Sequence, residues 1–265
     1  YQDTISVFKK NKMPYASYGK VSVYKTKGKK IGMIAVNGLE GVSSSEYYIK
    51  KGIQKLKKKK VNLIIVSMHA GIEKTSSIND VQKSIAHYAV QHGANLVLGH
   101  HPHTLQGIEK YKGAYIVYSL ANFCFGGNTN PADKDTMIFQ QTFTITSDGV
   151  QADNVTNIIP CSISSADGYN NYQPTPATGD EATRIKSKID ERSAAIPTAD
   201  STAKSSGDTG SSDTVSADDA SGSTDTSDES ESDTDSDFSD ESDGSDYDTS
   251  EDYDTSDEED YSSDE

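Results

Sequence analysis

Two apolar runs that each end in histidine constrain the fold of this chain more than any other feature. They are residues 63–69 (LIIVSMH) and 95–103 (NLVLGHHPH). The stretch from about residue 80 to 92 between them is helix-like, and Gly93 after it is the residue type that commonly ends a helix. A strand, a helix and a strand in this order form a βαβ unit, whose strands are parallel and often adjacent. Open α/β sheets carry their sites beyond the carboxyl ends of such strands, so both histidine segments are predicted to share one edge.

The histidines at these strand ends are candidate metal ligands, because neutral imidazole is the commonest transition-metal ligand in proteins. The candidates are His69, His100, His101 and His103. The alternative for a lone histidine such as His69 is a solvated side chain, and for residues 100–103 it is a polar turn. His87 and His92 lie on the predicted helix and are expected to pack or to face solvent.

Charge divides the chain near residue 200. Residues 201–265 hold 25 acidic residues and one basic residue, whereas residues 1–200 hold 16 acidic and 24 basic residues. The acidic segment has almost no aliphatic side chains, so it cannot bury enough apolar surface to offset the entropy cost of ordering. We therefore predict one domain over residues 1–196 and a disordered acidic tail over residues 197–265. Residues 233–237 resemble a calcium loop only superficially, since its Gly and final Glu are missing.

Further helices and strands are predicted around the βαβ unit. Helices are expected over residues 2–12 and 44–60, and after a capping-box pattern at residues 178–181. Strands are expected over residues 21–24, 31–36, 114–120, 137–145 and 150–159, with hairpin turns at 25–30 and 147–149. No apolar run approaches the roughly 18 residues of a membrane span. Cys124 and Cys161 lie in strand-like contexts and are expected to be core thiols, with a disulfide left open.

Several segments resemble a known family, the bacterial capsule synthesis proteins associated with poly-γ-glutamate. Residues 66–73 (VSMHAGIE) are similar to the family's strand followed by His-Trp-Gly-x-Glu, and residues 99–106 (GHHPHTLQ) to its signature. Residues 118–123 (YSLANF) resemble its Tyr-Ser-Leu-Gly-Asn-Phe. With the ending around residues 172–174, the resemblance covers most of residues 1–192. It implies a layered α/β fold of the calcineurin-like metallophosphoesterase type.

The resemblance also implies a site for divalent metal ions, of which Mn, Zn and Fe are the candidates. The Gly-His start of the signature argues for His100 as a ligand, while the His-Pro-His spacing argues for His101 and His103. Glu73 is either a carboxylate that orients an imidazole or a surface residue. Asn122 either lines the cleft through its amide or stabilises a turn.

Two positions depart from the family pattern. Ala70 stands where the family has Trp, so the cleft is expected to lack an aromatic wall. Ala121 replaces a Gly, so its backbone is expected to be restricted. The aspartates and the Asn-His pair that complete such sites do not occur in this sequence, which begins at Tyr1 in what resembles the middle of the domain. We therefore expect the N-terminal half of the domain and a membrane anchor to be missing from this fragment.

In function, the resemblance implies biosynthesis or export of a capsule or another extracellular anionic polymer, with poly-γ-glutamate as the polymer. The expected location is the extracellular face of the membrane or the cell surface. A metal-dependent hydrolase is expected in the full-length form, and no activity in this fragment. The alternatives are a noncatalytic polyanion-binding or scaffold module, which the lysine excess of residues 1–200 would suit, and an interaction protein working through its acidic tail. The expected partners are an anionic polymer or a capsule-synthesis membrane complex, with no nucleic acid.

Overall fold

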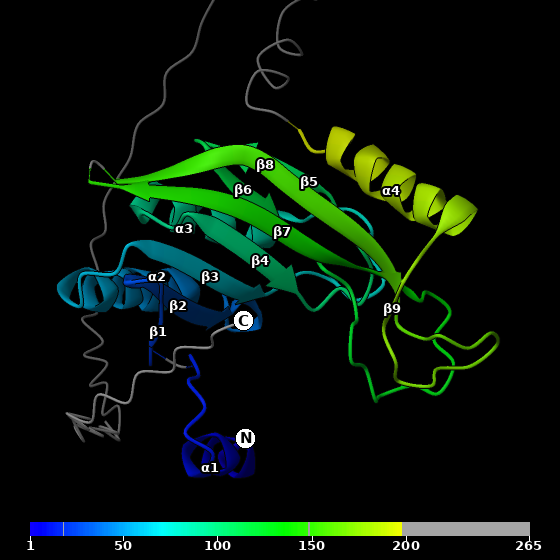
Figure 1. The fold of residues 1–265 in the computed structure, drawn as a ribbon, viewed down its shortest axis with the longest axis horizontal. Helices are drawn as coiled ribbons and strands as arrows, with labels where there is room; N and C mark the ends of the chain where they lie inside the picture. Colours follow the sequence, from blue (N-terminus) through cyan, green and yellow to red (C-terminus); the bar gives the residue numbers. More distant parts are fainter. Residues whose placement is uncertain (18, 148, 198–265) are drawn as a thin grey trace, which may run out of the picture. The chain divides into compact units, whose positions relative to one another are not determined.

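The structure is a computed structural model that describes residues 1–17, 19–147 and 149–197. The predicted acidic tail lies outside the described residues, so its disorder and the domain boundary at residue 196 stay predictions. The predicted α/β class is confirmed by a mixed sheet of six strands and an antiparallel sheet of three (Figure 1). No helix within the described ranges is long and apolar enough to cross a membrane.

The larger sheet has the strand order β1-β2-β3-β4-β6-β5. Its strands are β1 (Ser22–Thr26), β2 (Lys29–Asn37), β3 (Leu63–His69), β4 (Leu96–His100), β5 (Ile108–Tyr111) and β6 (Ala114–Val117). Strands β2, β3, β4 and β6 are parallel, and the edge strands β1 and β5 run antiparallel to their neighbours. The smaller sheet has the order β7-β8-β9. Its strands are β7 (Asp135–Thr146), β8 (Gly149–Ser162) and β9 (Thr175–Pro176).

Helices connect and cover these sheets. They are α1 (Gln2–Lys10), the 3-10 helix η1 (Gly38–Glu40), α2 (Val42–Lys58), α3 (Asp80–His92) and α4 (Gly179–Ala194). The apolar sides of α2 and α3 pack with β2, β3 and β4 in one core cluster, which includes Ile53 and Ile85. A second cluster joins β6 to β7 and α4 through Val117, Met137 and Ile185. The neighbouring residues Ile116 and Val117 of β6 point to opposite faces of the larger sheet and belong to the first and second cluster respectively, so this sheet is covered on both faces.

The βαβ unit predicted from residues 63–103 is present. Helix α3 spans the predicted residues and ends at Gly93, whose φ of 117° is left-handed. At the other end, the Asn79 side chain accepts a hydrogen bond from the Gln82 backbone N–H, and the Gln82 side chain accepts one from the Asn79 backbone N–H. This reciprocal capping box sets where the helix begins.

The predicted hairpins are also present, and some boundaries differ. Strand β6 ends at Val117 rather than residue 120, and β5 was not predicted because its sequence, IEKY, is half charged and forms an edge. The prediction of a capping box at residues 178–181 is wrong. Thr178 is the N-cap of α4 but makes no side-chain capping bond, and Gly179 after it is left-handed, with a φ of 55°. Residue 148 of the second hairpin turn lies outside the described residues.

The two cysteines differ in environment. Cys161 is buried on β8, as predicted, whereas Cys124 is exposed and lies outside the strands. The expectation of a core thiol is therefore wrong for Cys124. Both thiols are free, so the disulfide that the sequence left open is not formed.

Candidate metal site

The parallel strands bring two of the histidines side by side. His69 is the last residue of β3 and His100 the last residue of β4, and the two are paired in register. The Ala70 N–H donates to the His100 carbonyl at 3.1 Å, which extends the pairing by one residue. His101 and His103 follow directly in the loop after β4. We call His69, His100, His101 and His103 the histidine edge.

Three side chains form a group of the size that one metal ion needs. The ligand atoms of Glu73, His101 and His103 all lie within 4.8 Å of one another. The rings of His101 and His103 are 6.2 Å apart between centroids. The His69 ring is 4.7 Å from that of His101, so His69 borders this group, whereas His100 lies outside it. Of the two ligand sets left open by the sequence, this geometry favours the His-Pro-His pair.

Asn122 fixes the orientation of His103. The His103 Nδ1 hydrogen bonds to the Asn122 side-chain oxygen at 2.7 Å, and the Asn122 amide donates to the His103 carbonyl at 3.4 Å. An amide oxygen only accepts, so Nδ1 carries the proton and Nε2 is left with a lone pair for a metal. The Asn122 amide thus orients His103, while Glu73 is exposed and stands among the candidate ligands.

A buried amide network positions the loop that carries Glu73. Gln106 is fully buried, and its Nε2 donates to the carbonyls of Thr75 at 2.9 Å and Ser77 at 3.0 Å. The Gln82 amide donates in turn to the Gln106 oxygen at 2.8 Å. The loop also bonds directly to the histidine segment, where the Lys74 N–H donates to the Pro102 carbonyl at 2.7 Å. Sequence reasoning missed Gln82 and Gln106, because nothing in a buried glutamine's local sequence marks its distant partner.

The backbone around the histidines is in an unfavourable conformation. Four non-glycine residues here have positive φ: Lys74 (59°), His101 (100°), His103 (57°) and Ala121 (64°). Side chains with a Cβ rarely adopt such angles, which persist only when surrounding contacts hold them. The restriction expected for Ala121, where the family carries Gly, is therefore present.

The surroundings of His69 and His100 favour the neutral form of these two imidazoles. Burial lowers the pKa of His69, and the nearby His101, His100 and His103 lower it further. Burial also lowers the pKa of His100. Neutral imidazole is the form that binds metal, and imidazole nitrogen together with carboxylate oxygen is a donor set that suits a divalent transition metal.

A groove of about 720 Å³ begins at this group of ligands. Glu73, His103 and Asn122 line one end, and the Phe125 ring lies 5.3 Å from the His103 ring between centroids. Ala70 contributes nothing to it. Ala70 is fully buried, and a Cβ built on Gly38 would lie 2.5 Å from the Ala70 Cβ. The Ala70 side chain therefore points into the core and adds no aromatic surface to the groove.

The fold and the site together define an α/β protein with a histidine-rich candidate metal site at the carboxyl edge of parallel strands. Residues 3–127 match the family described as bacterial capsule synthesis protein PGA_cap. Over these residues, which are just under half of the chain, the sequence is of the capsule synthesis type. The match includes the whole histidine edge, Glu73 and Asn122, and it ends before β7.

Curated relatives agree with this assignment. The chain is 43% identical over 68 residues to the PGA biosynthesis protein CapA of Bacillus subtilis (strain 168), a segment that is 26% of this chain and 18% of that protein. It is 41% identical over 69 residues to the capsule biosynthesis protein CapA of Bacillus anthracis, or 26% of this chain and 17% of that protein. The matched segment is thus less than a fifth of either relative's length.

One solved structure, of a hypothetical protein from Thermus thermophilus, aligns with 53% of this chain and 60% of that chain. The TM-score is 0.36 and the sequence identity 12%, values too low to carry an argument.

Proposed function

We propose that this chain takes part in the biosynthesis of an extracellular anionic capsule polymer, and that His101, His103 and Glu73 bind a divalent metal ion. The observation that carries the metal site is the convergence of these three side chains within ligand distance of one another. Family membership and the names of the curated relatives support the capsule role, with poly-γ-glutamate as the polymer.

The residues of the site have separable tasks in this proposal. A divalent ion, when bound, would polarise an ester or amide oxygen and lower the pKa of a bound water. His101 and His103 provide nitrogen ligands, and Asn122 keeps the His103 Nδ1 protonated so that Nε2 faces outward. Glu73 provides an anionic oxygen from an exposed loop, where its charge is available to an ion. The groove beside them offers Lys74 and Asn128 to an anionic or amide-containing substrate.

Metal titration tests the proposal directly. We expect isothermal titration with Zn²⁺ or Mn²⁺ to show binding that a His101→Ala/His103→Ala variant loses. His92→Ala is the matched control, because His92 stacks on Tyr88 of the same helix, away from this group. Equal binding by wild type and the double variant would rule out this site.

A polyanion-binding module without catalysis is the second candidate. The observation that favours it is the excess of basic residues over residues 1–200, including four exposed lysines at residues 57–60. Cosedimentation with poly-γ-glutamate in the presence of a chelator separates the two candidates. Polymer binding that survives both the chelator and the double histidine variant would favour the noncatalytic module. In both candidates we place the protein at the outer cell surface, in contact with the membrane-bound polymer machinery.

A further inference from the structure

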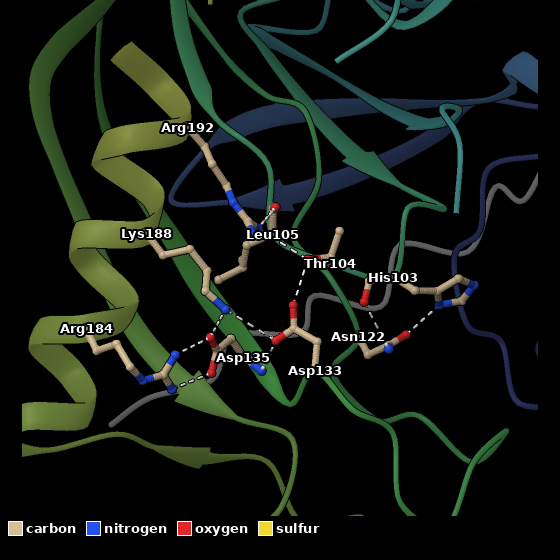
Figure 2. Close-up of polar contacts among 9 residues, drawn as sticks. All are labelled: His103, Thr104, Leu105, Asn122, Asp133, Asp135, Arg184, Lys188 and Arg192. Atoms are coloured by element: carbon tan, nitrogen blue, oxygen red, sulfur yellow. Dashed lines mark hydrogen bonds and ion pairs between the residues drawn. The ribbon is translucent and has the colours of Figure 1, made fainter. Parts of the chain in front are cut away.

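Helix α4 places three basic side chains on one face. Arg184, Lys188 and Arg192 are spaced four residues apart and project from the same side of the helix (Figure 2). Arg184 donates two hydrogen bonds of 2.7 Å to the buried carboxylate of Asp135, which Lys188 also contacts. Lys188 lies 3.5 Å from Asp133 as well. We call Asp133, Asp135, Arg184 and Lys188 the ion-pair cluster.

Arg192 extends this face to the loop that carries His103. Its Nη1 donates to the Leu105 carbonyl and, at 3.2 Å, to the Thr104 hydroxyl oxygen. The helix backbone also packs closely here, since a Cβ built on Gly107 would lie 2.5 Å from the Arg192 carbonyl oxygen. The last turn of α4 is therefore attached to the segment that follows the histidines.

The Thr104 hydroxyl is held in one orientation. A guanidinium only donates, so the bond from Arg192 occupies a lone pair of this hydroxyl, whose proton is directed to Asp133 at 2.7 Å. Thr104 is 6% exposed, so water does not readily replace these partners. Asp133 is fixed in turn by the Asp135 N–H at 3.1 Å. Thr104, the residue next to His103, is thus held between Arg192 of α4 and Asp133 in the loop before β7.

This clamp is placed where the backbone needs support. His101 and His103 have positive φ, and such strain persists only when surrounding contacts hold it. The loop is restrained on one side by the Lys74 N–H at the Pro102 carbonyl, and on the other by Thr104. Freeing the Thr104 side would let the loop relax and rotate the His103 imidazole away from Asn122.

We infer that Thr104, Asp133 and Arg192 are positioning residues that hold His103 in the geometry for metal binding. The inference rests on the proposed metal site and deepens it, because it makes ligand geometry depend on α4. The clamp's outer parts, Asp133 and Arg192, lie outside the residues matched by the capsule synthesis family, which end at residue 127.

The test compares two variants of one residue. Thr104→Val keeps the shape but removes both hydrogen bonds, so we expect its Kd for Zn²⁺ to rise about tenfold, the usual effect of losing an outer partner of a ligand. Thr104→Ser keeps the hydroxyl and should restore binding close to that of wild type. Arg184→Gln is the matched control: it breaks the two-hydrogen-bond ion pair with Asp135 on the same helix face without touching residues 101–105, so it should lower the Tm but leave the Kd unchanged.

A second readout needs no metal. The ¹⁵N shifts of the His103 imidazole report its tautomer, measured in chelator well above the ordinary histidine pKa of about 6.5. Wild type should show Nδ1 protonated, whereas Thr104→Val should show a mixture of tautomers. Unchanged Kd and unchanged shifts in Thr104→Val would overturn the inference, as would an equal loss of metal affinity in Arg184→Gln. If wild type binds no metal, the proposed function fails, and the tautomer measurement still decides the positioning role.

Discussion

The histidine edge and the ion-pair cluster differ in how their ionisable side chains are paired. In the ion-pair cluster each carboxylate has a basic partner, and Asp135 is almost completely buried with two of them. At the histidine edge the imidazoles of His69, His101 and His103 lie close to one another, and within the described residues Glu73 is the acidic side chain that stands among them. The first region pairs its carboxylates with basic side chains, whereas the second brings imidazole and carboxylate groups together within the distance that one metal ion could bridge.

The difference separates stability from function in this fold. The ion-pair cluster attaches α4 to β7 through side chains that balance one another's charge without a bound ion. The histidine edge carries positive φ angles at His101 and His103 and lowered pKa values at His69 and His100, features that cost stability and that the proposed metal ion would account for. Substitutions of Asp135 or Arg184 in the first region should therefore affect folding more than metal binding, and substitutions of His101 or His103 in the second should affect metal binding more than folding.

The largest expected effect is a loss of protein stability on substitution in the ion-pair cluster. Asp135→Asn removes a buried charge that two basic side chains share, so we expect a loss of about 3 kcal/mol in the free energy of unfolding. The affinity for Zn²⁺ should stay close to that of wild type. Urea unfolding and metal titration measure the two quantities, with the exposed Asp190→Asn on the same helix as control. A large loss of affinity with little loss of stability would reverse the comparison.

A smaller effect is expected from relieving backbone strain at Ala121, next to Asn122, whose amide contacts the histidine edge. Ala121 has a φ of 64°, which glycine adopts at no steric cost. Ala121→Gly should therefore stabilise the protein by about 0.5 kcal/mol. This net gain is the conformational strain that is relieved in the folded state, minus the extra conformational entropy that glycine gives the unfolded chain. Ala132→Gly, at an exposed position without positive φ, should destabilise it instead. A loss of stability in Ala121→Gly, measured by urea unfolding, would show that residue 121 is unstrained.

The smallest effect is a pH dependence that distinguishes the two regions in chelator. His69 and His100 have folded pKa values below the ordinary 6.5, so the unfolded chain binds more protons and stability falls as the pH drops below about 6.5. Burial alone would raise the pKa of Asp135, but Arg184 and Lys188 hold it below 3.8, so its contribution is lost only at more acidic pH. A His69→Gln/His100→Gln variant should flatten the Tm profile between pH 7 and 5, as measured by circular dichroism, and leave the acid limb near pH 3. An unchanged slope between pH 7 and 5 would contradict the lowered histidine pKa values.

Local patterns predicted the part of the fold that surrounds the histidine edge. The apolar runs and Gly93 identified β3, α3 and β4, because burial on both faces and a helix end leave marks in the adjacent sequence. The same parallel pairing explains why His69 and the later histidines were expected at one edge. The position of Ala121 was informative because a side chain there meets a backbone angle that glycine accepts.

Long-range contacts explain what the sequence could not predict. Arg184 and Asp135 are 49 residues apart, and neither residue's neighbours indicate the other. The bond between Asn122 and His103 likewise joins two loops, so the sequence left the role of the amide open. Thr178 has the residue type of a helix cap, but the left-handed Gly179 prevents the capping geometry that the pattern predicted.

Gln82 couples the start of α3 to the loop that carries Glu73, so the two segments are expected to unfold locally together. Its side chain caps the helix and also donates to Gln106, which holds the carbonyls of Thr75 and Ser77. Fraying of the first helical turn would leave these buried amides without partners, a cost that couples the two segments into one cooperative unit. How long Glu73 stays in place beside His101 and His103 is then expected to depend on how often the first turn of α3 opens.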